Sequence, residues 1–138
     1  MKGQRSYKVK KEDLLYPELS FKIVGLLFEV CNKLEYGYLE KHYCDGMAAL
    51  LKQEGIPFQR EVKMEIKLGD EVIASGRADF IIDRKIVLEM KKGRQFKKNN
   101  IGQLHSYLKA LNMELGILAN FTPDGLIFKR IVNTNTNS

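Results

Sequence analysis

Apolar residues near the start of the chain recur at the spacing of α-helices. Over residues 19–34 they fall every three or four positions, which predicts one helix. Gly37 breaks this pattern, and a second helix is predicted over about 39–54. The end of that helix is well marked, because Gly55 suits the position after a helix and Pro57 cannot continue one.

After residue 60 the apolar pattern changes its period from helical to alternating. Residues 62–68 alternate without a fault, which predicts a half-buried strand. Gly69 and Asp70 form a turn signal, so residues 71–82 are predicted to return as the second strand of a hairpin. The remaining predicted elements are a strand at 85–91, a helix at about 100–111, and strands at 115–120 and 126–132.

The predicted order of elements is α-α-β-β-β-α-β-β. This order favours an α/β fold in which helices flank a mixed central sheet. We expect one domain over residues 14–132, preceded by a flexible basic arm at 1–13 and followed by a disordered tail at 133–138.

Composition excludes several classes of protein. The 138 residues are 44% hydrophobic and 29% charged, which is ordinary for one globular domain. No apolar stretch approaches the ~18–20 residues of a membrane span, so no membrane partner is expected, and the N-terminus lacks the apolar core of a signal peptide. Cys31 and Cys44 are too few for a disulfide scaffold, which favours a cytoplasmic protein.

The net charge of +6 is concentrated in one segment. Seven basic residues and a single acid, Glu89, lie between Arg84 and Lys98. Such a cluster suits a polyanion such as nucleic acid. On charge alone, a solvated lysine-rich surface is the simpler interpretation.

Two acids stand in apolar surroundings on neighbouring predicted strands. Asp79 adjoins Phe80, and Glu89 lies within Ile-Val-Leu-Glu-Met. Acids in such surroundings are costly unless they are paired or bind a cation, and carboxylates flanking one hairpin can converge. Lys91 shares a strand face with Glu89. Together these groups would form a hard-cation site for an ion such as Mg²⁺. The simpler alternative is an ion pair of Lys91 with Glu89 or Asp79 at a sheet edge, because the spacing of the three residues is short and degenerate.

Two helices offer further polar groups to this site. Glu40 begins the second predicted helix and shares its inward-facing stripe with Tyr43 and Met47, where an acid needs a partner. The alternative is a first-turn acid stabilised by the helix dipole. Gln103 and Tyr107 lie on one face of the third predicted helix, where a polar helix edge with a half-buried tyrosine is the alternative.

Five short motifs follow one another along the chain. They are G-x-x-E-x-x-Y at 37–43, G-x-x-D at 76–79, E-x-K at 89–91, Q-x-x-x-Y at 103–107 and Gly-Ile-Leu-Ala-Asn-Phe at 116–121. This order resembles the GxxExxY protein family of the PD-(D/E)XK nuclease superfamily over about residues 19–132. The chain departs from the superfamily pattern in having Ala78, rather than proline, before Asp79.

The resemblance implies a fold and an activity. The implied fold is a restriction-endonuclease-like α-β-β-β-α-β core with an extra N-terminal helix and an extra C-terminal strand. The implied activity is hydrolysis of phosphodiester bonds of nucleic acid, with DNA as the expected partner and Mg²⁺ or Mn²⁺ as the cofactor.

The resemblance also implies roles for residues of this chain. Asp79 and Glu89 would bind the metal, with Glu40 as a further ligand or as a partner of metal-bound water. Lys91 would orient that water or stabilise charge on the phosphate, and Gln103 and Tyr107 would help to organise the site. Four cations near the loop after the third strand would hold backbone phosphates without reading sequence, namely Lys92, Arg94, Lys97 and Lys98.

Two other functions are compatible with the same sequence features. The fold could serve as a catalytically inert nucleic-acid-binding module, or as a protein-interaction subunit whose basic face docks on an acidic partner. Salt-sensitive DNA binding separates the protein-interaction subunit from the other two, and metal-dependent cleavage separates the nuclease from the inert module. One active site nicks one strand, so double-strand cutting would need a homodimer or two events.

Overall fold

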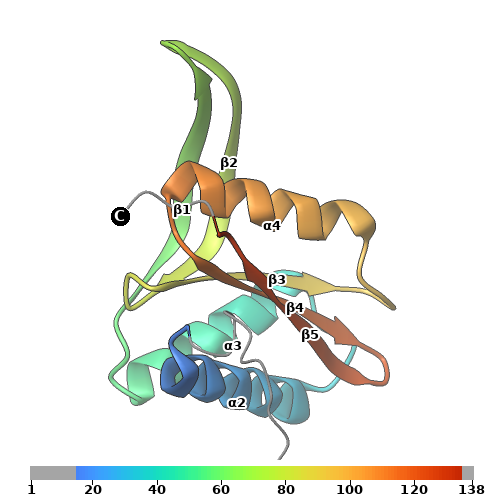
Figure 1. Cartoon of the computed structure of the whole chain (residues 1–138). Helices are drawn as coiled ribbons and strands as arrows, with labels where there is room; N and C mark the ends of the chain where they lie inside the picture. Colours follow the sequence, from blue (N-terminus) through green and yellow to red (C-terminus); the bar gives the residue numbers. More distant parts are fainter. Residues whose placement is uncertain (1–14, 135–138) are drawn as a thin grey trace, which may run out of the picture.

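The computed structural model describes residues 15–134 and shows a sheet with helices on both of its faces (Figure 1). Helices α2 (Pro17–Leu34) and α3 (Glu40–Gln53) cover one face, and α4 (Lys98–Leu111) covers the other. No helix in this part of the chain is long and apolar enough to span a membrane. The predicted arm at 1–13 and most of the predicted tail at 133–138 lie outside the described residues.

The sheet has five strands in the order β1-β2-β3-β4-β5. Strands β3 and β4 pair in parallel and are joined by α4, whereas all other neighbours pair antiparallel. The mixed sheet, with α2 before the α-β-β-β-α-β core and β5 after it, confirms the predicted α/β fold class. The strands are β1 (Phe58–Leu68), β2 (Glu71–Ile82), β3 (Ile86–Lys92), β4 (Leu115–Thr122) and β5 (Gly125–Val132).

Strand β3 is buried on both faces. Ile86, Leu88 and Met90 belong to the core under α2 and α3, whereas Val87 belongs to the core under α4. The predicted alternation of β3 is therefore confirmed. It leaves Glu89, which is only 3% exposed, in the central layer of the protein.

Strand β1 begins at Phe58, four residues before the predicted start. The alternation of buried and exposed positions fails at its beginning, so periodicity did not reveal it. The ladder pairs Arg60 with Phe80 and Val62 with Ala78. Between these pairs Glu61 takes a left-handed φ of 50°, which a non-glycine residue rarely adopts.

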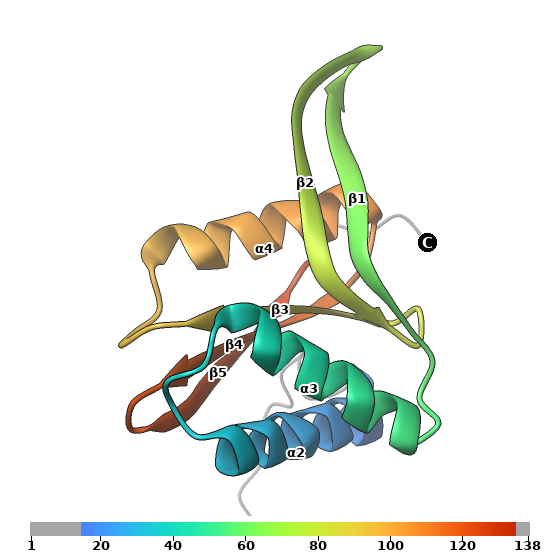
Figure 2. The same cartoon turned by 180° about the vertical axis from the view of Figure 1, so that it is seen from behind.

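The β1–β2 hairpin extends beyond the rest of the sheet as a long ribbon (Figures 1 and 2). Strand β2 pairs with β3 only from Phe80 to Ile82. The two strands therefore diverge immediately before Phe80, and they leave a fork at Asp79 on one strand and Glu89 on the other.

Candidate active site

The carboxylates of Asp79 and Glu89 lie at the fork where β2 leaves β3. Glu89 Oε1 accepts a hydrogen bond from the backbone N–H of Asp79 at 2.7 Å. In return, Asp79 Oδ2 accepts one from the backbone N–H of Met90 at 2.8 Å. The structure thus brings together the two predicted acids, and each carboxylate satisfies a backbone donor of the other strand.

Burial raises the pKa of both acids above its ordinary value. Burial, followed by the charge of Asp79, raises the pKa of Glu89 to about 8. Burial also raises the pKa of Asp79. Lys91 opposes both shifts, and its Nζ lies 4.0 Å from Glu89 Oε2. The site is therefore short of positive charge, and a bound cation would displace a proton from it.

The donor set fits a hard divalent cation. Each carboxylate spends one oxygen on a backbone hydrogen bond, which leaves Asp79 Oδ1 and Glu89 Oε2 for another ligand. Within residues 15–134, no three His, Cys, Asp or Glu side chains gather closely enough to coordinate one ion. Mg²⁺ keeps several waters and is typically bound by one or two protein carboxylates. Asp79 and Glu89 supply two such carboxylates.

Glu40 is the first residue of α3, and its carboxylate reaches the end of β3. Its Oε2 accepts a hydrogen bond from the backbone N–H of Lys92 at 3.2 Å. The predicted inward-facing stripe is correct for Tyr43 and Met47, which are buried, but wrong for Glu40, which is exposed. The reason is that α3 starts at the rim of the sheet, so its first side chain lies beside the strand end rather than beneath the sheet.

The G-x-x-E-x-x-Y motif explains why α3 starts there. Gly37 has a φ of 125°, which glycine adopts at little cost, so the chain can turn into the helix. The ring of Tyr43 stacks on Phe121 of β4 with 4.6 Å between centroids, and its hydroxyl donates to the Glu35 carbonyl. The tyrosine thereby fastens α3 to the sheet and places Glu40 near the fork.

Asp79 and Glu40 line the same cavity, which has a volume of about 320 Å³ and lies among α3, β1 and β2. Arg77, two residues before Asp79, also lines it, and its position on the same strand face is visible in the sequence. Arg60 lines the cavity as well. The sequence did not indicate this residue, because the predicted strand began after it. The other residues lining the cavity are Lys41, Cys44 and Glu61.

Tyr107 is buried against the β1–β2 hairpin, whereas Gln103 is exposed to solvent. The Tyr107 ring fills the space beside Gly76, and a Cβ at residue 76 would lie 2.6 Å from Tyr107 Cε1. Burial and then the charge of Glu89 raise the pKa of Tyr107. Gln103 is exposed on the surface of α4.

The predicted basic residues lie in and beside the loop between β3 and α4, since Lys92 ends β3 and Lys98 begins α4. Asn120 Nδ2 donates to the Gly93 carbonyl at 3.0 Å, which ties the start of the loop to β4. Lys92 Nζ lies 4.9 Å from the centroid of the Tyr36 ring. The other three cations are exposed, namely Arg94, Lys97 and Lys98.

Comparison with known families assigns the chain. A family model described as the PD-(D/E)XK nuclease superfamily matches residues 17–131, which is most of the sequence. The chain belongs to the PD-(D/E)XK nuclease superfamily. Membership accounts for the α-β-β-β-α-β order around the fork of β2 and β3.

One solved structure similar to this PD-(D/E)XK chain is that of SSO0001. The two share 28% sequence identity with a TM-score of 0.54. The similarity covers 89% of this chain and 60% of that one, so this chain spans well under the full length of SSO0001. The comparison with curated proteins found no match.

Proposed function

We propose that this chain is a divalent-metal-dependent nuclease that hydrolyses phosphodiester bonds of nucleic acid, with DNA as the expected substrate. The observation that carries the proposal is the reciprocal pair of Asp79 and Glu89, with Lys91 beside it, in a PD-(D/E)XK chain. The five ordered motifs support placing the chain in the GxxExxY branch of that superfamily. The free thiols of Cys31 and Cys44 accord with action in the reducing cytoplasm.

Asp79 and Glu89 are the proposed direct ligands of Mg²⁺ or Mn²⁺. A bound ion of this kind supplies Lewis-acid polarisation of a phosphate oxygen and lowers the pKa of a coordinated water. Glu40 is assigned to the same centre at one remove, as an acceptor for a metal-bound water, because its carboxylate lies at the end of β3 on Lys92 N–H. Such outer partners orient the inner ligands and sustain metal affinity.

Lys91 is the proposed catalytic cation. Its ammonium lies 4.0 Å from Glu89 Oε2 and remains partly exposed, so it can contact both the site and a substrate. In that place it orients the attacking water or stabilises the charge that develops on the phosphate. Tyr107 supports the hairpin that carries Asp79, and the exposed Gln103 is assigned to the nucleic acid.

The basic loop is the proposed contact for backbone phosphates. The four cations are Lys92, Arg94, Lys97 and Lys98, and they surround the start of α4 next to the end of β3. Lysine and arginine contacts to phosphate supply affinity without reading sequence. One site cuts one strand, so cleavage of both strands of a duplex would require a homodimer or two events.

A cleavage panel tests the proposal. Single-stranded, double-stranded and branched DNA and RNA are incubated with the full chain in Mg²⁺, Mn²⁺ or EDTA. We expect cutting that needs metal and that Glu89→Ala and Lys91→Ala each abolish. Salt-dependent binding without cutting by any variant would contradict the nuclease and favour an inert binding module. If the protein neither cuts nor binds any substrate of the panel, nucleic acid is not its ligand.

A further inference from the structure

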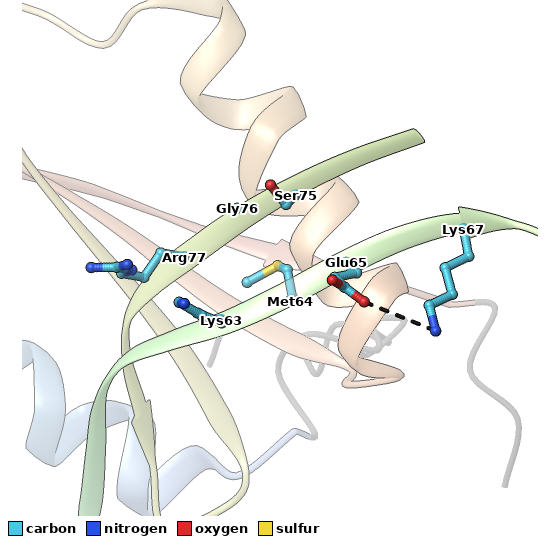
Figure 3. A pocket seen from close by; sticks show the side chains of 7 residues that line it. All are labelled: Lys63, Met64, Glu65, Lys67, Ser75, Gly76 and Arg77. Atoms are coloured by element: carbon cyan, nitrogen blue, oxygen red, sulfur yellow. Dashed lines mark ion pairs between the residues drawn. The ribbon is translucent and has the colours of Figure 1, made fainter. Parts of the chain in front are cut away.

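The β1–β2 hairpin carries a second cavity, which is lined by basic residues. It lies farther along the hairpin than the cavity of Asp79 and Glu40, which is called the catalytic cavity below. Where the two strands leave the sheet, a groove of about 730 Å³ follows the ribbon (Figure 3). Three basic residues line it against one acid, and they are Lys63, Lys67 and Arg77 against Glu65. The acid offsets only one cation, since Glu65 Oε1 lies 3.9 Å from Lys67 Nζ. The groove is therefore net positive without any metal.

Arg77 joins the groove to the catalytic cavity, because it lines both. It lies two residues before Asp79 and so projects from the same face of β2, about 6.6 Å away along the strand. Its guanidinium is held by Glu61, with Nη1 3.2 Å from Oε1. A nucleic-acid strand with one phosphate at Asp79 would therefore meet Arg77 next and then the outer groove.

Lys63 is the direct cross-strand partner of Arg77. Both side chains extend to the same side of the ribbon (Figure 3). Like charges directly opposite each other on two strands are destabilising. Glu61 offsets one of these two charges, and an anion bound between them would offset the other. A backbone phosphate is the anion that a nuclease substrate would bring to this place.

We propose that this groove is a phosphate-binding track that holds the nucleic acid beyond the cleavage site, with Arg77, Lys63 and Lys67 as its contacts. The proposal rests on the nuclease function proposed above. Contacts of this kind fix the position of the strand but carry no sequence information. The track therefore contributes affinity that increases with substrate length.

The test measures how binding depends on salt. Fluorescence anisotropy follows a labelled oligonucleotide bound by the full chain in EDTA, where no metal supports cleavage, over a series of KCl concentrations. The test variant is Lys63→Gln/Lys67→Gln/Arg77→Gln. Its control removes three exposed lysines from α2, α3 and β5 and changes the net charge equally, as Lys33→Gln/Lys52→Gln/Lys129→Gln. Glu65→Gln removes the acid from the groove.

The logarithm of the binding constant falls linearly with the logarithm of the salt concentration. Each lost phosphate contact reduces the magnitude of this salt slope by about 0.7 for single-stranded and about 0.9 for duplex DNA. The test variant is expected to lose about 2–3 of slope, the control variant to keep the wild-type slope, and Glu65→Gln to bind more tightly. An unchanged salt slope in the test variant would overturn the phosphate-binding track but not the nuclease function. The same holds if the control variant loses as much slope as the test variant. Wild-type protein that neither binds nor cuts nucleic acid overturns the track and the nuclease together.

Discussion

The ring of Tyr107 occupies the place where a side chain at residue 76 would begin. A Cβ at residue 76 would lie 2.6 Å from Cε1 and 2.9 Å from the hydroxyl of Tyr107. This contact couples the glycine of G-x-x-D to the tyrosine of Q-x-x-x-Y. Because Asp79 follows Gly76 on the same strand, the contact also sets the position of a proposed metal ligand relative to α4.

Gly76→Ala is expected to destabilise the fold, because the new methyl group overlaps the Tyr107 ring. Overpacking of this kind costs about 1–3 kcal/mol. The measurement is the free energy of unfolding in urea. Gly102→Ala on α4, with open space around its Cβ, is the matched control and should be neutral or slightly stabilising.

A double-mutant cycle decides whether Tyr107 is the cause. In a Tyr107→Ala background the cost of Gly76→Ala should shrink, since the overlapping ring is gone. An equal cost in both backgrounds would show that the glycine is required for another reason.

The metal-free protein is expected to lose stability as the pH rises from about 4.5 to about 8. Over this range the folded chain keeps a proton on Glu89 that the unfolded chain has released, because burial raises the pKa of Glu89 from 4.5 to about 8. The folded state binds more protons there, so the free energy of unfolding falls with pH. Each pKa unit corresponds to about 1.4 kcal/mol, which makes the loss on the order of a few kcal/mol.

Glu89→Gln should flatten this dependence and stabilise the metal-free protein at pH 8. The measurement is Tm against pH in EDTA, with Glu71→Gln on the exposed hairpin as the control. Added Mn²⁺ should raise the Tm of the wild type more at pH 8 than at pH 6, because the ion competes with protons. Parallel pH curves for Glu89→Gln and the wild type would contradict the assignment of the raised pKa.

Glu40→Ala is expected to reduce activity far more than stability. The side chain is exposed and makes one hydrogen bond of 3.2 Å, so its loss should change the free energy of unfolding by about 0.5 kcal/mol. Glu40 is the proposed outer partner of the metal centre, so its loss should cost about 10–100-fold in metal affinity or cleavage rate.

Glu18→Ala is the matched control for Glu40, because Glu18 is also an exposed first-turn acid, in this case of α2. The two variants should have a similar Tm but very different cleavage rates. Equal and small effects on the cleavage rate would mean that Glu40 only stabilises its helix through the dipole.

The sequence predicts the fold and the centre of the site because both depend on local periodicity. The alternation of β3 places Glu89 and Lys91 on one face of that strand. Asp79 lies on β2, which is the other strand of the β2–β3 hairpin. The left-handed turn at Glu61 has no periodic signal, so the start of β1 and the place of Arg60 were missed. The exposure of Glu40 depends on where α3 meets the sheet, which is a property of packing between distant segments.

Asp79 and Glu89 are the proposed holders of the metal that permits phosphodiester cleavage. The most direct measurement is the initial cleavage rate against free Mn²⁺ concentration, for the wild type, Asp79→Asn and Glu29→Gln, with Glu29 on the outer helix α2 as the control. The wild type and Glu29→Gln should show the same saturable dependence, whereas Asp79→Asn should lose about 10²–10³-fold in rate. Cleavage that persists in EDTA, or at the wild-type rate in Asp79→Asn, would contradict the account.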